Sequence, residues 1–198
     1  MGIALALCFA GPATAQPASD YAQRYASLCA ACHGTQGRSQ MAMAPSLAGQ
    51  PSFYVATQLF LFRDGRRDNA AMTAVAKTLT DDDLRGFSDH IGAMPAASAT
   101  ATATAPTPAA DATRMARGKT LAQQHLCASC HGADFSGGEQ VPRLAQQRED
   151  YLSTTLREFQ SGQRAGYTNA MAEALRGIAP ADLDTLAYYL ARFGAPAR

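Results

Sequence analysis

The chain has 198 residues, with 17 basic and 16 acidic side chains, a balance that argues against a nucleic-acid binder because such proteins carry a clustered basic face. Hydrophobic residues make up 47% of the sequence. No apolar run reaches the length of about 18 residues that a membrane-spanning helix needs, and the total length allows one or two domains.

The first fifteen residues have the pattern of an export signal. A short apolar segment over residues 3–10 is followed by Gly11 and Pro12, and then by the small-residue sequence Ala13-Thr14-Ala15 that precedes a signal cleavage site. We expect residues 1–15 to be a signal peptide and the mature protein to be periplasmic. A short core helix is the alternative interpretation.

The pentapeptide Cys-x-x-Cys-His occurs twice, at residues 29–33 and 127–131. This motif attaches c-type haem: the two thiols add to the two vinyl groups of one porphyrin, and the histidine that follows becomes an axial iron ligand. A redox dithiol or half of a zinc site is the alternative, but a zinc site needs a second ligand pair nearby. We therefore expect two covalently bound haem c groups, held by Cys29, Cys32, Cys127 and Cys130.

Each pentapeptide is surrounded by helical patterns. A helix precedes it, a middle helix is predicted over residues 53–63 and 151–160, and a last helix begins with acidic residues at 80–83 and 180–182. No strand pattern competes, so we expect an all-α fold. The apolar face of the middle helix is predicted at Tyr54, Gln58, Leu61 and Phe62 in the first half, and at Tyr151, Thr155 and Phe159 in the second.

The two halves are copies of one unit. Beyond the pentapeptides, residues 45–50 match residues 142–147, and further identical residues recur at equivalent places. Between the copies, residues 95–111 consist almost entirely of Ala, Thr and Pro, a composition typical of a semi-extended linker. We therefore predict tandem domains at residues 17–94 and 112–198, joined by a linker at residues 95–111.

A carrier haem needs a second axial ligand opposite its histidine. After His131 the second copy contains a single methionine, Met171, and among the four methionines that follow His33 the repeat alignment selects Met72. A thioether ligand favours ferrous iron and raises the reduction potential. We expect the axial pairs His33–Met72 and His131–Met171, with core packing of the methionines as the alternative.

The second ring nitrogen of each histidine also needs a hydrogen-bond partner. The backbone carbonyl groups of Pro45 and Pro142 are the predicted acceptors. Arg67 and Arg164 recur near the two methionines. Two interpretations of these arginines stay open, namely pairing with haem propionates and a solvated surface position.

Together these features resemble the di-haem cytochromes c of the class-four type. The resemblance covers nearly all of the mature chain and implies two class I cytochrome c domains in a pseudo-twofold arrangement, with haems close enough for electron transfer between them. The long Ala/Thr/Pro linker departs from the family pattern. The motifs that carry the resemblance are the paired pentapeptides, Pro45-x-Leu47-Ala48-Gly49-Gln50, Tyr54-x(3)-Gln58-Leu59, Gly65-x-Arg67 and the late methionines.

The family implies a periplasmic one-electron carrier, in some cases loosely associated with a membrane. Its donor would be a cytochrome bc complex or a dehydrogenase, and its acceptor a terminal oxidase or reductase. Iron saturated by histidine and methionine has no open position for a substrate, which favours a carrier over an enzyme. Two alternatives stay open: a cytochrome subunit of a dehydrogenase complex, and a di-haem peroxidase, which needs one iron without a fixed distal ligand.

Overall fold

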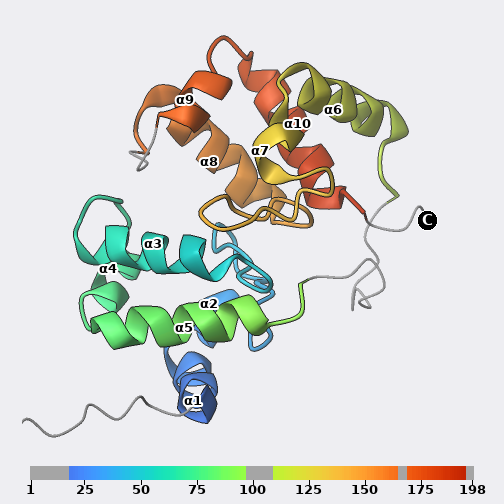
Figure 1. Ribbon diagram of the computed structural model, residues 1–198. Helices are drawn as coiled ribbons and strands as arrows, with labels where there is room; N and C mark the ends of the chain where they lie inside the picture. The colour runs from blue at the N-terminus through green and yellow to red at the C-terminus, as the bar shows by residue number, and fades with distance from the viewer. Residues whose placement is uncertain (1–17, 97–108, 165–168, 195–198) are drawn as a thin grey trace, which may run out of the picture.

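The computed structural model describes residues 18–96, 109–164 and 169–194, which form helices joined by loops (Figure 1). The predicted signal peptide and most of the predicted linker lie outside these residues. Within them no strand is present, and the one isolated β-bridge pairs Gly138 with Val141. The all-α prediction is therefore confirmed. No helix in this part of the chain combines the length and the apolar character needed to cross a membrane.

The helices fall into two groups with the same order of elements. Each group has a long first helix, a short pentapeptide helix, a middle helix, a second short helix and a long last helix (Figure 1). The predicted middle and last helices are thus present in both copies. The first domain contains α1 (Ala18–Leu28), α2 (Ala30–His33), α3 (Ser52–Arg63), α4 (Ala70–Ala76) and α5 (Asp81–Ala93); the second contains α6 (Ala112–Gln124), α7 (Cys127–His131), α8 (Glu149–Ser161), α9 (Ala170–Ala174) and α10 (Pro180–Arg192).

In the first domain, α5 packs against both α1 and α3. Tyr25 and Phe87 are among the most deeply buried side chains of this core. Where α1 crosses α5, Gly86 lies against the ring of Tyr21, and a Cβ atom at Gly86 would come within 2.1 Å of a ring carbon. The missing side chain therefore lets the two helices approach closely.

In the second domain, α10 packs against α6 and α8 in the same way. Leu183 and Leu186 are almost completely buried in this core. The close crossing recurs with its partners exchanged, since Gly118 lies on the first helix and Tyr189 on the last, and a Cβ atom at Gly118 would lie 2.3 Å from Cβ of Tyr189. Both copies thus depend on a glycine–tyrosine contact between their first and last helices.

The predicted apolar face of the second middle helix is wrong. The buried side chains of α8 are Leu152 and Leu156, whereas Tyr151 and Thr155 are only partly buried and contact Arg164. Both sets of residues have helical spacing, so periodicity alone does not identify the face that meets the core.

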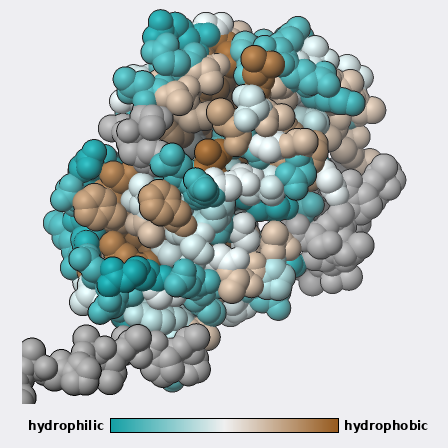
Figure 2. Space-filling model, viewed as in Figure 1, coloured by the Kyte–Doolittle hydropathy of each residue, from teal (hydrophilic) through white to brown (hydrophobic). Residues whose placement is uncertain are grey.

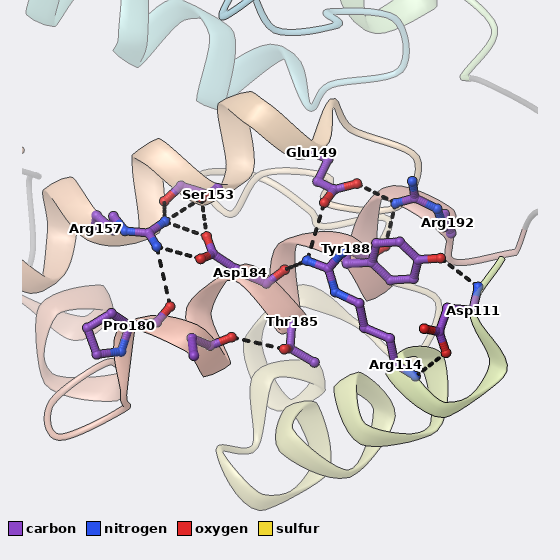
Figure 3. Close-up of polar contacts among 11 residues, drawn as sticks. Asp111, Arg114, Glu149, Ser153, Arg157, Pro180, Asp184, Thr185, Tyr188 and Arg192 are labelled. Atoms are coloured by element: carbon purple, nitrogen blue, oxygen red, sulfur yellow. Dashed lines mark hydrogen bonds and ion pairs between the residues drawn. The ribbon is translucent and has the colours of Figure 1, made fainter. Parts of the chain in front are cut away.

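A polar network on the surface of the second domain links three helices (Figure 3). Arg157 on α8 makes a two-pronged contact with Asp184 on α10, with N–O distances of 2.5 and 2.6 Å. At the other end of α10, Arg192 binds Glu149 at 2.6 Å, and the hydroxyl of Tyr188 accepts a hydrogen bond from the backbone of Asp111 at 2.7 Å. These contacts hold α6 and α8 against α10.

The domains are docked by hydrogen bonds that repeat across a pseudo-twofold axis. The side chain of Gln50 donates to the carbonyl of Arg143 at 2.9 Å and accepts from its N–H at 3.0 Å. Gln147 donates to the carbonyl of Ser46 at 2.8 Å and accepts from its N–H at 2.7 Å. Gln50 and Gln147 hold equivalent places in the two copies, as do Ser46 and Arg143, so each domain presents the same patch to the other.

Acidic residues begin α5 as predicted, and one of them also makes a long-range ion pair. Thr80 and Asp83 form a capping box in which each side chain accepts from the other residue's backbone N–H. Asp83 also accepts a hydrogen bond from Arg24 on α1. The Arg24 guanidinium and the capping contacts hold the pKa of Asp83 at about 2, below its usual value.

We predict that Asp83→Asn lowers the free energy of unfolding by about 1 kcal/mol at neutral pH, a value reduced for solvent screening of the pair. The pKa of Asp83 is depressed in the folded state, so its contribution is present above the unfolded value of about 4 and is lost as the pH falls to about 2. Denaturant titrations from pH 7 to 2 should show the wild-type advantage shrinking over this window. A constant difference would contradict the assignment.

The side chain of Asn69 caps the short helix α4, whereas that of Asn169 does not cap α9. The Asn69 side chain accepts a hydrogen bond from the Met72 N–H at 3.0 Å, whereas Asn169 at the start of α9 makes no such bond. We predict that Asn69→Ala costs about 1 kcal/mol of local stability. Hydrogen exchange at the Met72 amide should then accelerate about fivefold, which is the change in the opening equilibrium that about 1 kcal/mol produces.

The matched control for this prediction is Asn169→Ala, which should leave exchange in α9 unchanged because no cap is lost. Equal effects of the two substitutions would show that the cap at Asn69 does not hold α4.

Candidate haem sites

Each pentapeptide forms one tight helical turn. In the first copy the N–H of His33 donates to the carbonyl of Cys29 at 2.9 Å, and the N–H of Gly34 donates to that of Ala30 at 2.8 Å. This turn places Cys29 and Cys32, three residues apart, on the same side of the helix. The second cysteine of each pentapeptide is exposed. The geometry suits attachment of both thiols to one ligand.

Neighbouring side chains hold the first pentapeptide in place. The hydroxyl of Tyr25 donates to the carbonyl of Gly34 at 3.0 Å, and the hydroxyl of Ser39 donates to that of Cys32 at 2.7 Å. Gly34 has a φ of +80°, which favours glycine at the sharp turn after the histidine. The chain can therefore leave the pentapeptide abruptly and return past the histidine.

Both histidine rings are buried and make the same hydrogen bond. Nδ1 of His33 lies 2.8 Å from the carbonyl oxygen of Pro45, and Nδ1 of His131 lies 2.9 Å from that of Pro142. A carbonyl only accepts, so Nδ1 must carry the proton and Nε2 presents a free lone pair. Burial lowers the pKa of both rings and keeps them neutral, as a metal ligand must be. The predicted proline acceptors are confirmed.

The acidity of the cysteines argues against the redox-dithiol alternative. Burial raises the pKa of Cys29 to about 11 and also raises that of Cys127. A reactive redox cysteine instead has a lowered pKa, because the thiolate is the attacking species.

The predicted methionine ligands lie on short helices. Met72 is in α4 and Met171 is in α9, and both side chains are partly buried. Met171 packs beside the core of the second domain. Met94 packs against the first core.

Arg67 and Arg164 meet between the two domains. Arg67 donates to Gln58 at 2.7 Å and to the hydroxyl of Tyr151 at 3.0 Å, and Arg164 lies 3.4 Å from the hydroxyl groups of both Tyr54 and Tyr151. Only 9% of Arg164 is exposed, so a solvated surface position is wrong for this residue.

The two arginines form no ion pair with any acidic side chain among the described residues. Burial raises the pKa of Tyr151, but the two guanidinium groups lower it by more, so this pKa lies below its usual value. A buried charge normally has a counter-ion. This cluster therefore fits an anionic group such as a haem propionate, and it joins both domains.

Several large apolar side chains are exposed, two of them directly before a pentapeptide. Leu28 and Leu126, which directly precede the first cysteines, are 44% and 71% exposed. On α3, Phe53 and Phe60 are exposed as well, and Figure 2 shows apolar surface in this part of the first domain. Such surface suits contact with an apolar macrocycle. The donor set, the uncompensated charge and this surface all fit two bound haems.

Sequence reasoning missed the roles of several interdomain residues. Gln50, Gln147, Tyr54 and Tyr151 all contact the opposite domain, yet the sequence suggested that the tyrosines belong to a core face. Their recurrence at equivalent positions was the available signal, since a pseudo-twofold interface uses the same residues twice.

Comparison with known proteins identifies the family and the fold of the chain. A family model described as "Cytochrome c" matches residues 115–193, and one described as "Cytochrome C oxidase, cbb3-type, subunit III" matches residues 16–91. The structure is similar to that of reduced recombinant cytochrome c4 from Pseudomonas stutzeri, with a TM-score of 0.77 and 24% identity over 88% of this chain and 97% of that one. This similarity confirms the two-domain cytochrome c fold.

Two curated relatives are more similar in sequence. The thiosulfate dehydrogenase electron acceptor of Stutzerimonas stutzeri is 31% identical over 85% of this chain and 80% of the relative. Cytochrome c4 of Thiocapsa roseopersicina is 34% identical over 77% of this chain and 78% of the relative. This identity over most of both chains, with a cytochrome c domain in each half, shows that the chain belongs to the cytochrome c4 family, and it is a di-haem electron-transfer protein with two covalently bound haem c groups.

Proposed function

We propose that the protein is a periplasmic one-electron carrier with two equivalent iron sites. Cys29 and Cys32 would attach one haem, and Cys127 and Cys130 the other. His33 with Met72, and His131 with Met171, would be the axial ligands. The proposed domains span residues 17–94 and 112–198, with residues 1–15 removed as a signal peptide. When bound, haem c supplies an iron centre that gains and loses a single electron.

The observation that carries this proposal is the same buried histidine in both domains. Each ring donates its Nδ1 proton to a proline carbonyl at 2.8 or 2.9 Å and leaves Nε2 unprotonated. Such a bond sets the ring orientation and raises the basicity of the ligand. Both copies would therefore hold their iron in the same way, as expected for a carrier with no substrate site.

The residues between the domains support electron transfer from one site to the other. Arg67 and Arg164 bring uncompensated positive charge to the interface, where they would bind haem propionates from both domains. Their contacts with Tyr54 and Tyr151 cross the interface and hold these groups in place. The proposed sites would thus share one polar cluster.

The proposal also includes the redox partners of the protein. The family resemblance favours a cytochrome bc complex or a dehydrogenase as donor and a terminal oxidase or reductase as acceptor. The Stutzerimonas relative is named as an electron acceptor of thiosulfate dehydrogenase, which favours a dehydrogenase as donor. A tightly bound dehydrogenase subunit is therefore the second candidate function. Loose association with the membrane would suit a donor or an acceptor that lies there.

We predict that Met72→Ala and Met171→Ala each abolish sulfur ligation at one haem and leave the other unchanged. Loss of the thioether removes a ligand that favours ferrous iron, so the potential of the altered haem should fall. Absorption spectroscopy and a redox titration of each variant provide the measurement. The wild-type protein should be low-spin at both haems and should bind carbon monoxide slowly at neutral pH.

Met94→Ala is the matched control, because Met94 packs in the core of the first domain. Both midpoints should be retained in this variant. Rapid peroxide turnover by the wild-type protein would favour the di-haem peroxidase instead, and unchanged sulfur ligation in Met72→Ala or Met171→Ala would show that another residue is the ligand.

The donor can be tested by stopped-flow reduction of the oxidised protein. We expect a thiosulfate dehydrogenase or a cytochrome bc complex to reduce both haems in a reaction that is second order at low protein concentration, as for a diffusing carrier. A dehydrogenase that remains bound through size-exclusion chromatography would instead support the subunit function.

A further inference from the structure

One peptide group connects each histidine with the opposite domain. The carbonyl of Pro45 accepts from Nδ1 of His33 at 2.8 Å, and the N–H of the same peptide group, which belongs to Ser46, donates to Oε1 of Gln147 at 2.7 Å. Because the atoms of a peptide group are conjugated, a stronger acceptor at its N–H makes its carbonyl oxygen a stronger acceptor. The side chain of Gln147 therefore acts on His33 through this peptide group.

The second domain contains the same connection in reverse. The carbonyl of Pro142 accepts from His131 at 2.9 Å, and the N–H of Arg143 donates to Oε1 of Gln50 at 3.0 Å. Gln50 and Gln147 are 5% and 6% exposed, so water does not readily replace these bonds. Each histidine is thus linked through one peptide group to a buried glutamine of the other domain.

We propose that Gln147 and Gln50 are positioning residues that tune the iron site of the opposite domain. This inference rests on the proposed ligation by His33 and His131. An acceptor on the peptide N–H strengthens the histidine–carbonyl bond and makes the imidazole a more electron-rich ligand. An electron-rich ligand stabilises ferric iron. Each glutamine therefore lowers the reduction potential of the haem in the opposite domain.

The sign of this effect separates it from a purely structural role. If the glutamines only held the domains together, their loss would open the interface and admit water to both sites. Water stabilises the more highly charged ferric state, so both potentials would fall. We call the proposed connection from glutamine through peptide group to histidine a relay. When one glutamine is lost, the relay predicts that a single haem potential rises, and that this haem is in the other domain.

The two relays differ in strength. The Ser46–Gln147 bond is 2.7 Å long, whereas the Arg143–Gln50 bond is 3.0 Å long. The shorter bond should polarise its peptide group more. The response of the first domain to loss of Gln147 should therefore exceed the response of the second domain to loss of Gln50.

Domain docking and oxidation state are then linked. If docking stabilises ferric iron, oxidation must strengthen docking by the same free energy. The oxidised protein should accordingly hold its domains together more tightly than the reduced protein.

The test is a redox titration of the complete haem-loaded protein followed by NMR, with each haem monitored through assigned resonances of its own domain. Direct changes beside a metal ligand alter metal affinity or activity by about 10–100-fold, and Gln147 lies one peptide group further away, so we expect about a threefold effect. Gln147→Leu should shift the ferrous–ferric equilibrium of the first haem by this factor, or about 30 mV upward for one electron. Gln50→Leu should raise the reduction potential of the second haem by a smaller amount.

Two further variants complete the design. Gln147→Glu keeps an acceptor for the Ser46 N–H and should not raise the first potential. Thr154→Val removes a different interdomain contact, in which the Thr154 hydroxyl donates to Sδ of Met43 at 3.8 Å, and changes no charge and neither peptide group. It should raise neither potential. The ¹⁵N shift of His33 Nδ1 should move in Gln147→Leu and not in Thr154→Val.

The outcomes distinguish this inference from the proposed function. If the wild-type protein did not show a low-spin spectrum at both haems, the proposed histidine–methionine ligation itself would be overturned. Normal spectra with both potentials falling, with no shift, or with the larger shift in the mutated domain would overturn the relay alone. A rise confined to the opposite domain in both leucine variants supports it.

Discussion

The hydrogen bond from each buried histidine ring to a proline carbonyl is the contact on which the rest of the structure depends. It places the Nδ1 proton, leaves Nε2 free and sets the orientation of a ring that follows directly after two attachment cysteines. The loop that contains Pro45 must return to the pentapeptide to make this bond, and the same loop then supplies Ser46 to the interface. Ligand geometry and domain docking are therefore built from one stretch of chain.

The central docking contacts are polar and symmetrical. Two buried glutamines each form a pair of hydrogen bonds with the backbone of the other domain, and two arginines and two tyrosines meet beside them. Backbone partners require no particular side chain, so Ser46 and Arg143 can differ while the contact is retained. A gene duplication would produce such an interface readily, because one self-complementary patch serves both sides.

Much of the fold and of the haem sites was predictable from the sequence. Haem attachment constrains the spacing within each pentapeptide, and the internal repeat marks residues that have the same role in both domains. The helices and the acceptors at Pro45 and Pro142 followed from these signals. The partners of Arg164 and the orientation of Tyr151 did not, since both depend on contacts between residues about 100 positions apart. A recurring tyrosine has the same spacing whether it faces a core or another domain, and only the docked structure separates the two.

A crystal structure of the haem-loaded protein tests the central claim most directly. The account predicts that Nε2 of His33 and of His131 binds iron while Nδ1 still donates to Pro45 or Pro142, and that the sulfur atoms of Met72 and Met171 occupy the opposite axial positions. A different axial ligand at either iron, or a histidine ring turned away from its proline carbonyl, would contradict it.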